Sequence, residues 1–324
     1  MATNYDKSDD SNIPYWKNQK PPTIRGQRFY DPLFPPNIKS LLGLDSNFDP
    51  IDQNAYDKND TVFPDEIEFK KPSEIFRDQN YDLFFNKIEI DDIIQGKLGD
   101  CYFLAAVSNL CRFSELILNL FKTKELNEDG YYEIIFYIDG IKQIVIIDDY
   151  IPVNKNTNWP IFAKPHKNKI WVMLLEKAWA KVNGGYSNAN YGWPSEAFEF
   201  LVGYGSTIFN LFKINKEDLA EYKIEVIKNV QISNINNFFI SCSTYNNEYI
   251  KQFGLVKNHA YTLVDFNKII TRYGKIVHLF KLRNPYSKGE WNGDWSDSSP
   301  LWDEKTKKQV RYNNKEDGIF LLMI

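Results

Sequence analysis

The sequence is poor in cysteine and histidine, with only three of each among its 324 residues. Three scattered cysteines are too few for a disulfide framework, and none has the paired spacing of a zinc site. The scarcity also restricts catalysis, because a cysteine nucleophile needs a base and only three histidines are available to serve as one. Because the few cysteines show neither disulfide nor zinc spacing, we expect reduced thiols and a cytoplasmic protein.

An excess of positive charge and a long apolar run are lacking as well. The formal net charge is -4 and no basic stripe with interleaved aromatic residues occurs, which disfavours nucleic acid as a partner. The N-terminus is polar and no apolar run reaches membrane-spanning length, so we expect neither a signal peptide nor a transmembrane segment. With 43% hydrophobic and 16% aromatic residues, the chain is able to bury a large core.

The most informative segment runs from Gln95 to Cys101 and reads QGKLGDC, which places one cysteine where a loop becomes a helix. Asp100 is expected to cap that helix. A thiol at a helix N-terminus meets free N–H groups and the positive end of the helix dipole, which favour the thiolate. Gln95 could donate its amide to an oxyanion. Alternatively, Cys101 is a small apolar residue of the core. Cys111 and Cys242 are assigned to packing of this kind.

Among the histidines, His259 best suits the role of a base. It lies near the start of the run NHAYTLVDF, which predicts a strand, whereas His166 lies in a polar loop and His278 within an apolar strand. Asn284 follows a further predicted strand and precedes a proline, so its side-chain carbonyl could hold an imidazole N–H and fix the tautomer. The order of cysteine, histidine and asparagine is that of papain-like chemistry.

The remaining pattern predicts an α+β fold. Residues 132–149 favour a hairpin that turns at Asp139 and Gly140, and residues 170–185 favour a helix whose apolar stripe joins the core. A short helix from residue 194 leads into a glycine-rich hinge near residue 205. Beyond that hinge the pattern turns to strands, which are predicted at residues 238–242, 260–266, 276–282 and 319–324.

These motifs resemble the protease core of the calpain family. QGKLGDCYFLAA resembles the cysteine motif of the family, NHAY at His259 its histidine motif, and LRNPYSKGEWNGDWSD at Asn284 its asparagine motif. The segments FYDPLFP, KPSEI, LLEKAWAKVNG and EDGIF follow in family order, from residue 28 onward. The resemblance implies a papain-like core of two lobes, with a polar leader over residues 1–27, a helical cysteine lobe over 28–203 and a β-rich lobe with the histidine and asparagine over 204–324.

The activity implied by the resemblance is that of a calcium-dependent cysteine endopeptidase that acts on protein substrates in the cytoplasm. By this resemblance, Cys101 is the nucleophile, and His259 is the general base and acid. Asn284 orients His259, and Gln95 stabilises the oxyanion together with the backbone N–H of Cys101. Because Cys101 and His259 lie far apart in the sequence, we expect the site to form when the lobes close, a step that calcium would favour.

No EF-hand loop is present, so the calcium implied by the resemblance must be held by acids near the motifs. The implied ligands of a first ion are Asp92 and Glu176, and those of a second are Glu290, Asp297 and Asp317. A further acid of the family, two residues after the last of these, is Ile319 in this chain. The alternative is that all five acids are surface charges or salt-bridge partners.

Two aromatic residues depart from the family pattern, since Tyr102 and Tyr286 stand where the family usually has tryptophan. Each keeps a large ring but adds a hydroxyl group that needs a partner. A catalytically silent calpain-like scaffold is therefore one alternative, and a cysteine acyltransferase of the transglutaminase kind is another. The chain ends on an apolar predicted strand, which suggests the edge of a domain; calpains commonly carry further regulatory domains or a subunit, and the resemblance leaves open whether they follow here.

Overall fold

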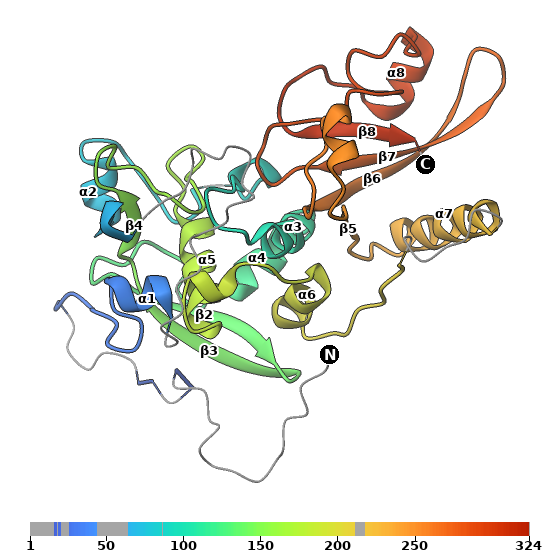
Figure 1. Ribbon diagram of the computed structural model, residues 1–324. Coiled ribbons are helices and arrows are strands. Elements are labelled where there is room, and N and C mark those ends of the chain that lie inside the picture. Colours follow the sequence, from blue (N-terminus) through green and yellow to red (C-terminus); the bar gives the residue numbers. More distant parts are fainter. Residues whose placement is uncertain are drawn as a thin grey trace.

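A computed structural model describes residues 16–17, 19–20, 26–43, 64–85, 87–210 and 218–323, and shows mixed helices and sheets (Figure 1). Most of the predicted leader, residues 1–27, lies outside the described residues. The helices are α1 (Ile38–Leu42), α2 (Pro72–Phe76), α3 (Cys101–Leu110), α4 (Ser114–Leu120), α5 (Trp171–Val182), α6 (Pro194–Val202), α7 (Leu219–Ile235) and α8 (Glu304–Val310). The strands are β1 (Ile67–Lys70), β2 (Tyr131–Ile138), β3 (Ile141–Asp148), β4 (Ile151–Asn154), β5 (Ser241–Ser243), β6 (Ala260–Ile270), β7 (Ile276–Arg283) and β8 (Ile319–Met323).

The largest hydrophobic core surrounds helices α3 and α5. Helix α5 was expected to bury one stripe, but it is buried on all sides along almost its whole length. Its two lysines are therefore paired inside the protein, with Lys177 against Asp148 and Lys181 against Asp31 at 2.7 Å. Buried charges persist only when a partner offsets the loss of water, and these two pairs provide it.

Antiparallel strands β2 and β3 form the predicted hairpin beside this core. The two turn residues, Asp139 and Gly140, both have positive φ, at 53° and 71°. A two-residue turn with positive φ at both positions matches the twist of the flanking strands, which explains the Asp-Gly sequence. The prediction of the hairpin and of its turn is confirmed.

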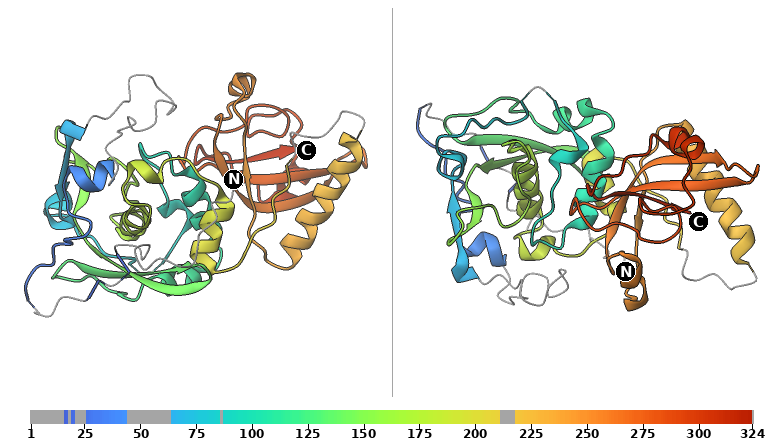
Figure 2. Two further views of the ribbon diagram at one scale, coloured as in Figure 1. Left: turned by 60° about the horizontal axis from the view of Figure 1, so that its bottom comes forward. Right: turned by 90° about the horizontal axis from the view of Figure 1, so that it is seen from above.

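The C-terminal part of the chain forms a four-stranded antiparallel sheet in the order β5-β6-β7-β8, with two smaller cores (Figures 1 and 2). The predicted strands at 260–266, 276–282 and 319–324 coincide with β6, β7 and β8. Helix α7 corrects the expectation that only strands follow the hinge. Its many isoleucine and valine residues favour a strand locally. The described side chains of the helix are exposed or half-buried, apart from Val230, which is buried.

Helix α3 lies where the largest core meets the C-terminal sheet (Figure 2). The hydroxyl of Thr262 on β6 donates to the carbonyl of Ala105 on α3 at 2.8 Å. The amide of Asn109 donates to the hydroxyl of Ser241 on β5 at 3.1 Å. Within the described ranges no single helix has the length and apolar character to cross a membrane, and the bent pair α3 and α4 passes that test only when taken together.

Candidate active site

A pocket at the N-terminus of α3 brings predicted site residues together from distant parts of the chain. On one side, Gln95 lies on the loop before α3 and Cys101 is the first residue of α3. On the other side, His259 directly precedes β6. The full set of lining residues is Gln95, Gly99, Cys101, Tyr191, Val256, Lys257, Asn258, His259 and Tyr286. The pocket is therefore built by both the largest core and the C-terminal sheet.

Cys101 is the first residue of α3 and is half-buried, as a nucleophile at a helix N-terminus would be. The preceding residue, Asp100, does not cap the helix with its side chain, which corrects that expectation. Its carboxyl group is fully buried beside that of Glu176 instead. Burial raises the pKa of Asp100 to about 7, and burial with the neighbouring Asp100 charge raises the pKa of Glu176 well above its usual range. The pair therefore holds a proton near neutral pH.

Gln95 is buried and fixed through its backbone and its side chain. Its backbone N–H donates to the carbonyl of Pro285 at 2.9 Å, and its amide nitrogen donates to the carbonyl of Leu98 at 2.7 Å. The next residue is Gly96 because a Cβ atom there would lie 1.9 Å from the carbonyl oxygen of Phe162. The side-chain nitrogen has two hydrogens, so one remains for a ligand in the pocket.

His259 contacts Asn284 through Nε2, which lies 2.8 Å from the side-chain oxygen of Asn284. The Asn284 amide nitrogen donates to the carbonyls of Lys288 and Gly289, at 2.8 and 3.1 Å, so its oxygen faces the imidazole. Because that oxygen only accepts, Nε2 carries the proton and Nδ1 is free to act as a base. Burial lowers the pKa of His259 to about 4, although the Asn284 contact opposes this shift.

The two tyrosines that depart from the family pattern are both accommodated. The ring of Tyr286 stacks on the imidazole of His259. The buried hydroxyl of Tyr102 donates to the carbonyl of Ala189 at 2.9 Å and accepts the indole N–H of Trp179 at 3.1 Å. The hydroxyl of Tyr102 thus has two hydrogen-bond partners, and its ring packs in the core and does not line the pocket.

Asp92 and Glu176, the predicted ligands of a first calcium ion, belong to different networks. The Asp92 carboxylate accepts from the ammonium of Lys169 at 2.7 and 3.0 Å and from the indole N–H of Trp171 at 3.1 Å. Glu176 accepts the backbone N–H of Ala163 at 2.9 and 3.0 Å. The surroundings of Asp92 do not fit a free calcium ion, because an ammonium group already binds both carboxylate oxygens.

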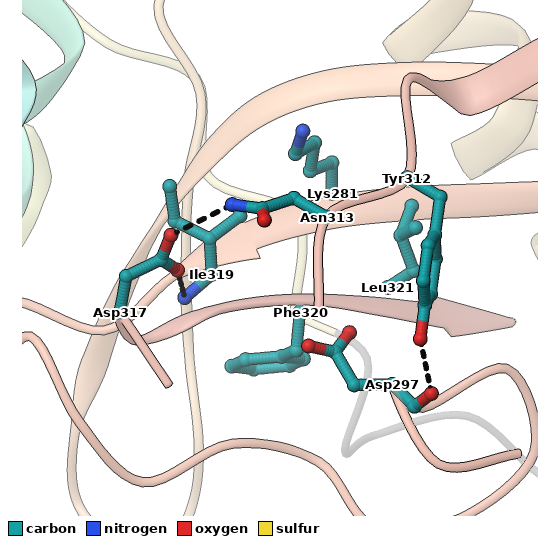
Figure 3. Close-up of a pocket in the computed structure, with 8 residues that line it drawn as sticks. All are labelled: Lys281, Asp297, Tyr312, Asn313, Asp317, Ile319, Phe320 and Leu321. Carbon is teal, nitrogen blue, oxygen red and sulfur yellow. Dashed lines mark hydrogen bonds between the residues drawn. The ribbon is translucent and has the colours of Figure 1, made fainter. Parts of the chain in front are cut away.

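The predicted ligands of the second ion lie near one another beside β8. A pocket there is lined by Asp297 and Asp317, together with Ile319 (Figure 3). Glu290 accepts the backbone N–H groups of Asp317 and Gly318 at 3.0 and 2.8 Å. Burial raises the pKa of Glu290 to about 7 and that of Asp297 to about 6, and the negative charges of neighbouring carboxylates contribute to both shifts. Mutual repulsion of this kind fits a set of donors for a cation.

These acids do not yet form a ready metal cage. Among the residues that the structure describes, no group of three or more histidine, cysteine, aspartate or glutamate side chains is arranged to hold a metal ion. The position where the family has a further acid is Ile319, whose apolar side chain lines the same pocket (Figure 3). A cation would therefore have to draw the carboxylates closer.

Two buried cations next to predicted site residues were not singled out by the sequence. Lys169 binds Asp92, and Arg283 at the end of β7 donates to the carbonyl of Ile93 at 2.7 Å and to the hydroxyl of Ser287 at 2.8 Å. Arg283 is completely buried, although the nearby strand pattern is apolar. A charged residue directly before Asn284, at the end of a largely apolar strand, was the available signal. For Lys169, in the polar run HKNK, the sequence offers no such signal.

Comparison with known proteins identifies the family. Residues 29–324 match the family described as calpain family cysteine protease. The chain is 34% identical to human calpain-14, over 81% of its own length and 37% of the relative's. It is 32% identical to the calpain-type cysteine protease DEK1 of Arabidopsis thaliana, over 92% and 13% of the two lengths, and 31% identical to the calpain-1 catalytic subunit of Bos taurus, over 91% and 40%. The chain belongs to the calpain family, and it spans less than half the length of these relatives.

Proposed function

We propose that this chain is the protease core of a calcium-dependent cysteine endopeptidase that makes limited cuts in protein substrates in the cytoplasm. The observation that carries the proposal is the pocket shared by Cys101, His259 and Gln95, with His259 held by Asn284 at 2.8 Å. The family and the two-sided pocket support a papain-like pair of lobes, with Cys101 on the helical lobe and the other two members of the triad on the β-rich lobe.

In the proposed reaction, Nδ1 of His259 accepts the thiol proton of Cys101, and the thiolate attacks the peptide carbonyl. The oxyanion accepts hydrogen bonds from the second amide hydrogen of Gln95 and from the backbone N–H of Cys101. His259 then gives the proton to the leaving amine, and a water molecule activated by His259 hydrolyses the thioester. Asn284 does not react, but it keeps Nε2 protonated and the ring in place.

Calcium dependence is proposed to act through the second group of acids, Glu290, Asp297 and Asp317. A bound cation would supply positive charge there and reduce the repulsion among the carboxylates. This group is connected to the triad, because Glu290 accepts the N–H of Gly318 at 2.8 Å and the carbonyl of Gly318 accepts the backbone N–H of Asn284 at 2.8 Å. A cation that fixes the positions of these acids would therefore also restrain Asn284, through the two hydrogen bonds that Gly318 makes.

The proposal is tested by cleavage of an unfolded protein substrate under reducing conditions, with and without millimolar calcium. We expect calcium-dependent cleavage by the wild type and by Cys242→Ala, a control at an exposed cysteine, and none by Cys101→Ala. Equal cleavage with and without calcium would support the proposed protease activity and refute its calcium dependence. No cleavage in any condition would favour the silent scaffold, and incorporation of an added amine would favour the acyltransferase.

A further inference from the structure

Lys169 is a buried cation surrounded by oxygen atoms. Its side chain is 5% exposed, and its ammonium nitrogen lies 2.7 and 3.0 Å from the two carboxylate oxygens of Asp92. It also lies 2.5 Å from the carbonyl oxygen of Lys87 and 3.7 Å from a carboxylate oxygen of Glu89. Two carboxylates and a backbone carbonyl are the donors that proteins use for calcium. Here an ammonium group of the chain itself occupies their centre.

We propose that the ammonium of Lys169 replaces a free cation in the cysteine lobe, so that residues 87–95 are held in place without calcium. The inference concerns the regulation of the proposed protease and to that extent rests on it. It confines calcium control to the acids Glu290, Asp297 and Asp317 of the other lobe. Asp92, which the resemblance to calpains implied as a calcium ligand, becomes the partner of a built-in cation.

The contacts around Lys169 make displacement by calcium unfavourable. Asp92 is 1% exposed and also accepts the backbone N–H of Glu89 at 3.0 Å, so its carboxylate has no room to turn toward an added ion. Glu89 is itself bound by the ammonium groups of Lys87 and Lys167 at 3.0 and 3.1 Å. Both carboxylates are thus neutralised by lysines, and a divalent ion would enter against positive charge.

The segment held by Lys169 also carries the contacts on which the candidate site depends. The carbonyl of Ile93, directly after Asp92, accepts from Arg283 at 2.7 Å. The N–H of Gln95, two residues further, donates to the carbonyl of Pro285 at 2.9 Å. Fixing Asp92 therefore fixes both the contact with the β-rich lobe and the proposed oxyanion donor. In this chain the segment that carries Gln95 is therefore held by the ammonium group of Lys169.

The first test counts bound calcium ions by isothermal titration calorimetry on the full chain. We expect wild type and Asp92→Asn to bind the same number of ions, because Asp92 serves Lys169. Lys169→Glu removes the ammonium and adds a carboxylate to the cage, so we expect it to bind one ion more than wild type. The loss of one ion in Asp92→Asn, or no gain in Lys169→Glu, would overturn the proposal.

A second variant guards against a change that merely unfolds the protein. Lys169→Met keeps the length of the side chain but leaves Asp92 without a cation, so we expect a lower melting temperature that calcium partly restores. If calcium shifts the melting of Lys169→Met no more than that of wild type, the cage does not accept a cation and the proposal fails. None of these measurements uses cleavage. If the protein has no protease activity but binds the expected numbers of calcium ions, the proposed function is contradicted and this inference is supported.

Discussion

The ring of Tyr286 lies parallel to the imidazole of His259, with 4.8 Å between the ring centroids and 1° between the planes. The edge of the same imidazole is held by Asn284, and Tyr261 packs against it at an angle of 88°. The orientation of the proposed base is thus fixed both in its plane and perpendicular to it. Tyr286 in addition covers one face of the imidazole from water, which makes it part of the burial that lowers the pKa of His259.

Removing that cover is expected to raise the pKa of His259. Tyr286→Ala exposes one face of the imidazole, so its pKa should move from about 4 toward 6.5, while Tyr286→Trp should leave it low. Titration of the histidine signals by NMR measures both variants, with His278 as an internal reference. An unchanged pKa in Tyr286→Ala would show that the tyrosine ring does not desolvate the base.

Asn284 is expected to affect the rate less than the two reacting residues. Asn284→Ala frees the imidazole to change tautomer, and we expect kcat to fall by about 10- to 100-fold, at or below the lower end of the usual effect of an acid-base group. Asn284→Asp places a negative charge beside Nε2, so it should raise the pKa of His259 and shift the pH profile upward. Steady-state kinetics against pH tests both, and equal profiles for Asp and Asn would contradict the assigned hydrogen bond.

The pH dependence of stability has a definite sign at His259. Burial lowers its pKa from 6.5 to about 4, so between these values the unfolded chain binds a proton that the folded chain does not. Stability is therefore lost as the pH falls through this window, by about 3 kcal/mol in full. Urea unfolding of wild type and His259→Gln from pH 7 to 4 isolates the term, because only the wild type should carry this part of the decline. Parallel curves would refute it.

The hydroxyl of Tyr102 is expected to stabilise the large core around α3 and α5. Tyr102→Phe leaves the indole N–H of Trp179 and the carbonyl of Ala189 without their partner inside the core, at a cost of about 1–3 kcal/mol in the free energy of unfolding. Urea denaturation measures the loss. A neutral substitution would mean that water or a small shift satisfies both groups.

Calcium affinity is expected to respond to position 319. Ile319→Glu adds a carboxylate beside Asp297 and Asp317, and we expect calcium to bind about tenfold more tightly, since the number of charged ligands tunes such sites. Ile319→Gln is the matched control, because it has the same shape without the charge. Calorimetric titration distinguishes them, and equal affinities would place the ion elsewhere.

How much the sequence predicted depended on the range of the interactions. The hairpin turn at Asp139 and the helix that begins at Cys101 follow from neighbouring residues, so both could be read directly. Helix α7 was missed because its β-branched residues and weak periodicity favour a strand locally. Cys242, assigned to packing, lies exposed on the short strand β5, since its position depends on how the edge of the sheet is covered.

The candidate site shows the same division. Cys101, Gln95, His259 and Asn284 were predicted because each lies in a motif with its own chemistry, and the structure groups the first three around one pocket and bonds the fourth to His259. The contact between Lys169 and Asp92 could not be predicted, because the two residues are separated by 77 positions and neither lies in a motif that names the other. Pairings of buried charges are decided by the fold as a whole.

The buried pair of Asp31 and Lys181 has a consequence for the order of folding. Lys181 also donates to the carbonyl of Ile146, on the hairpin, so its ammonium has a place only once α5 and that hairpin have met. Asp31 must then close a loop of 150 residues to reach it. Long closures are slow because chain entropy opposes them before any contact forms, and we therefore expect the segment around Asp31 to dock last in refolding.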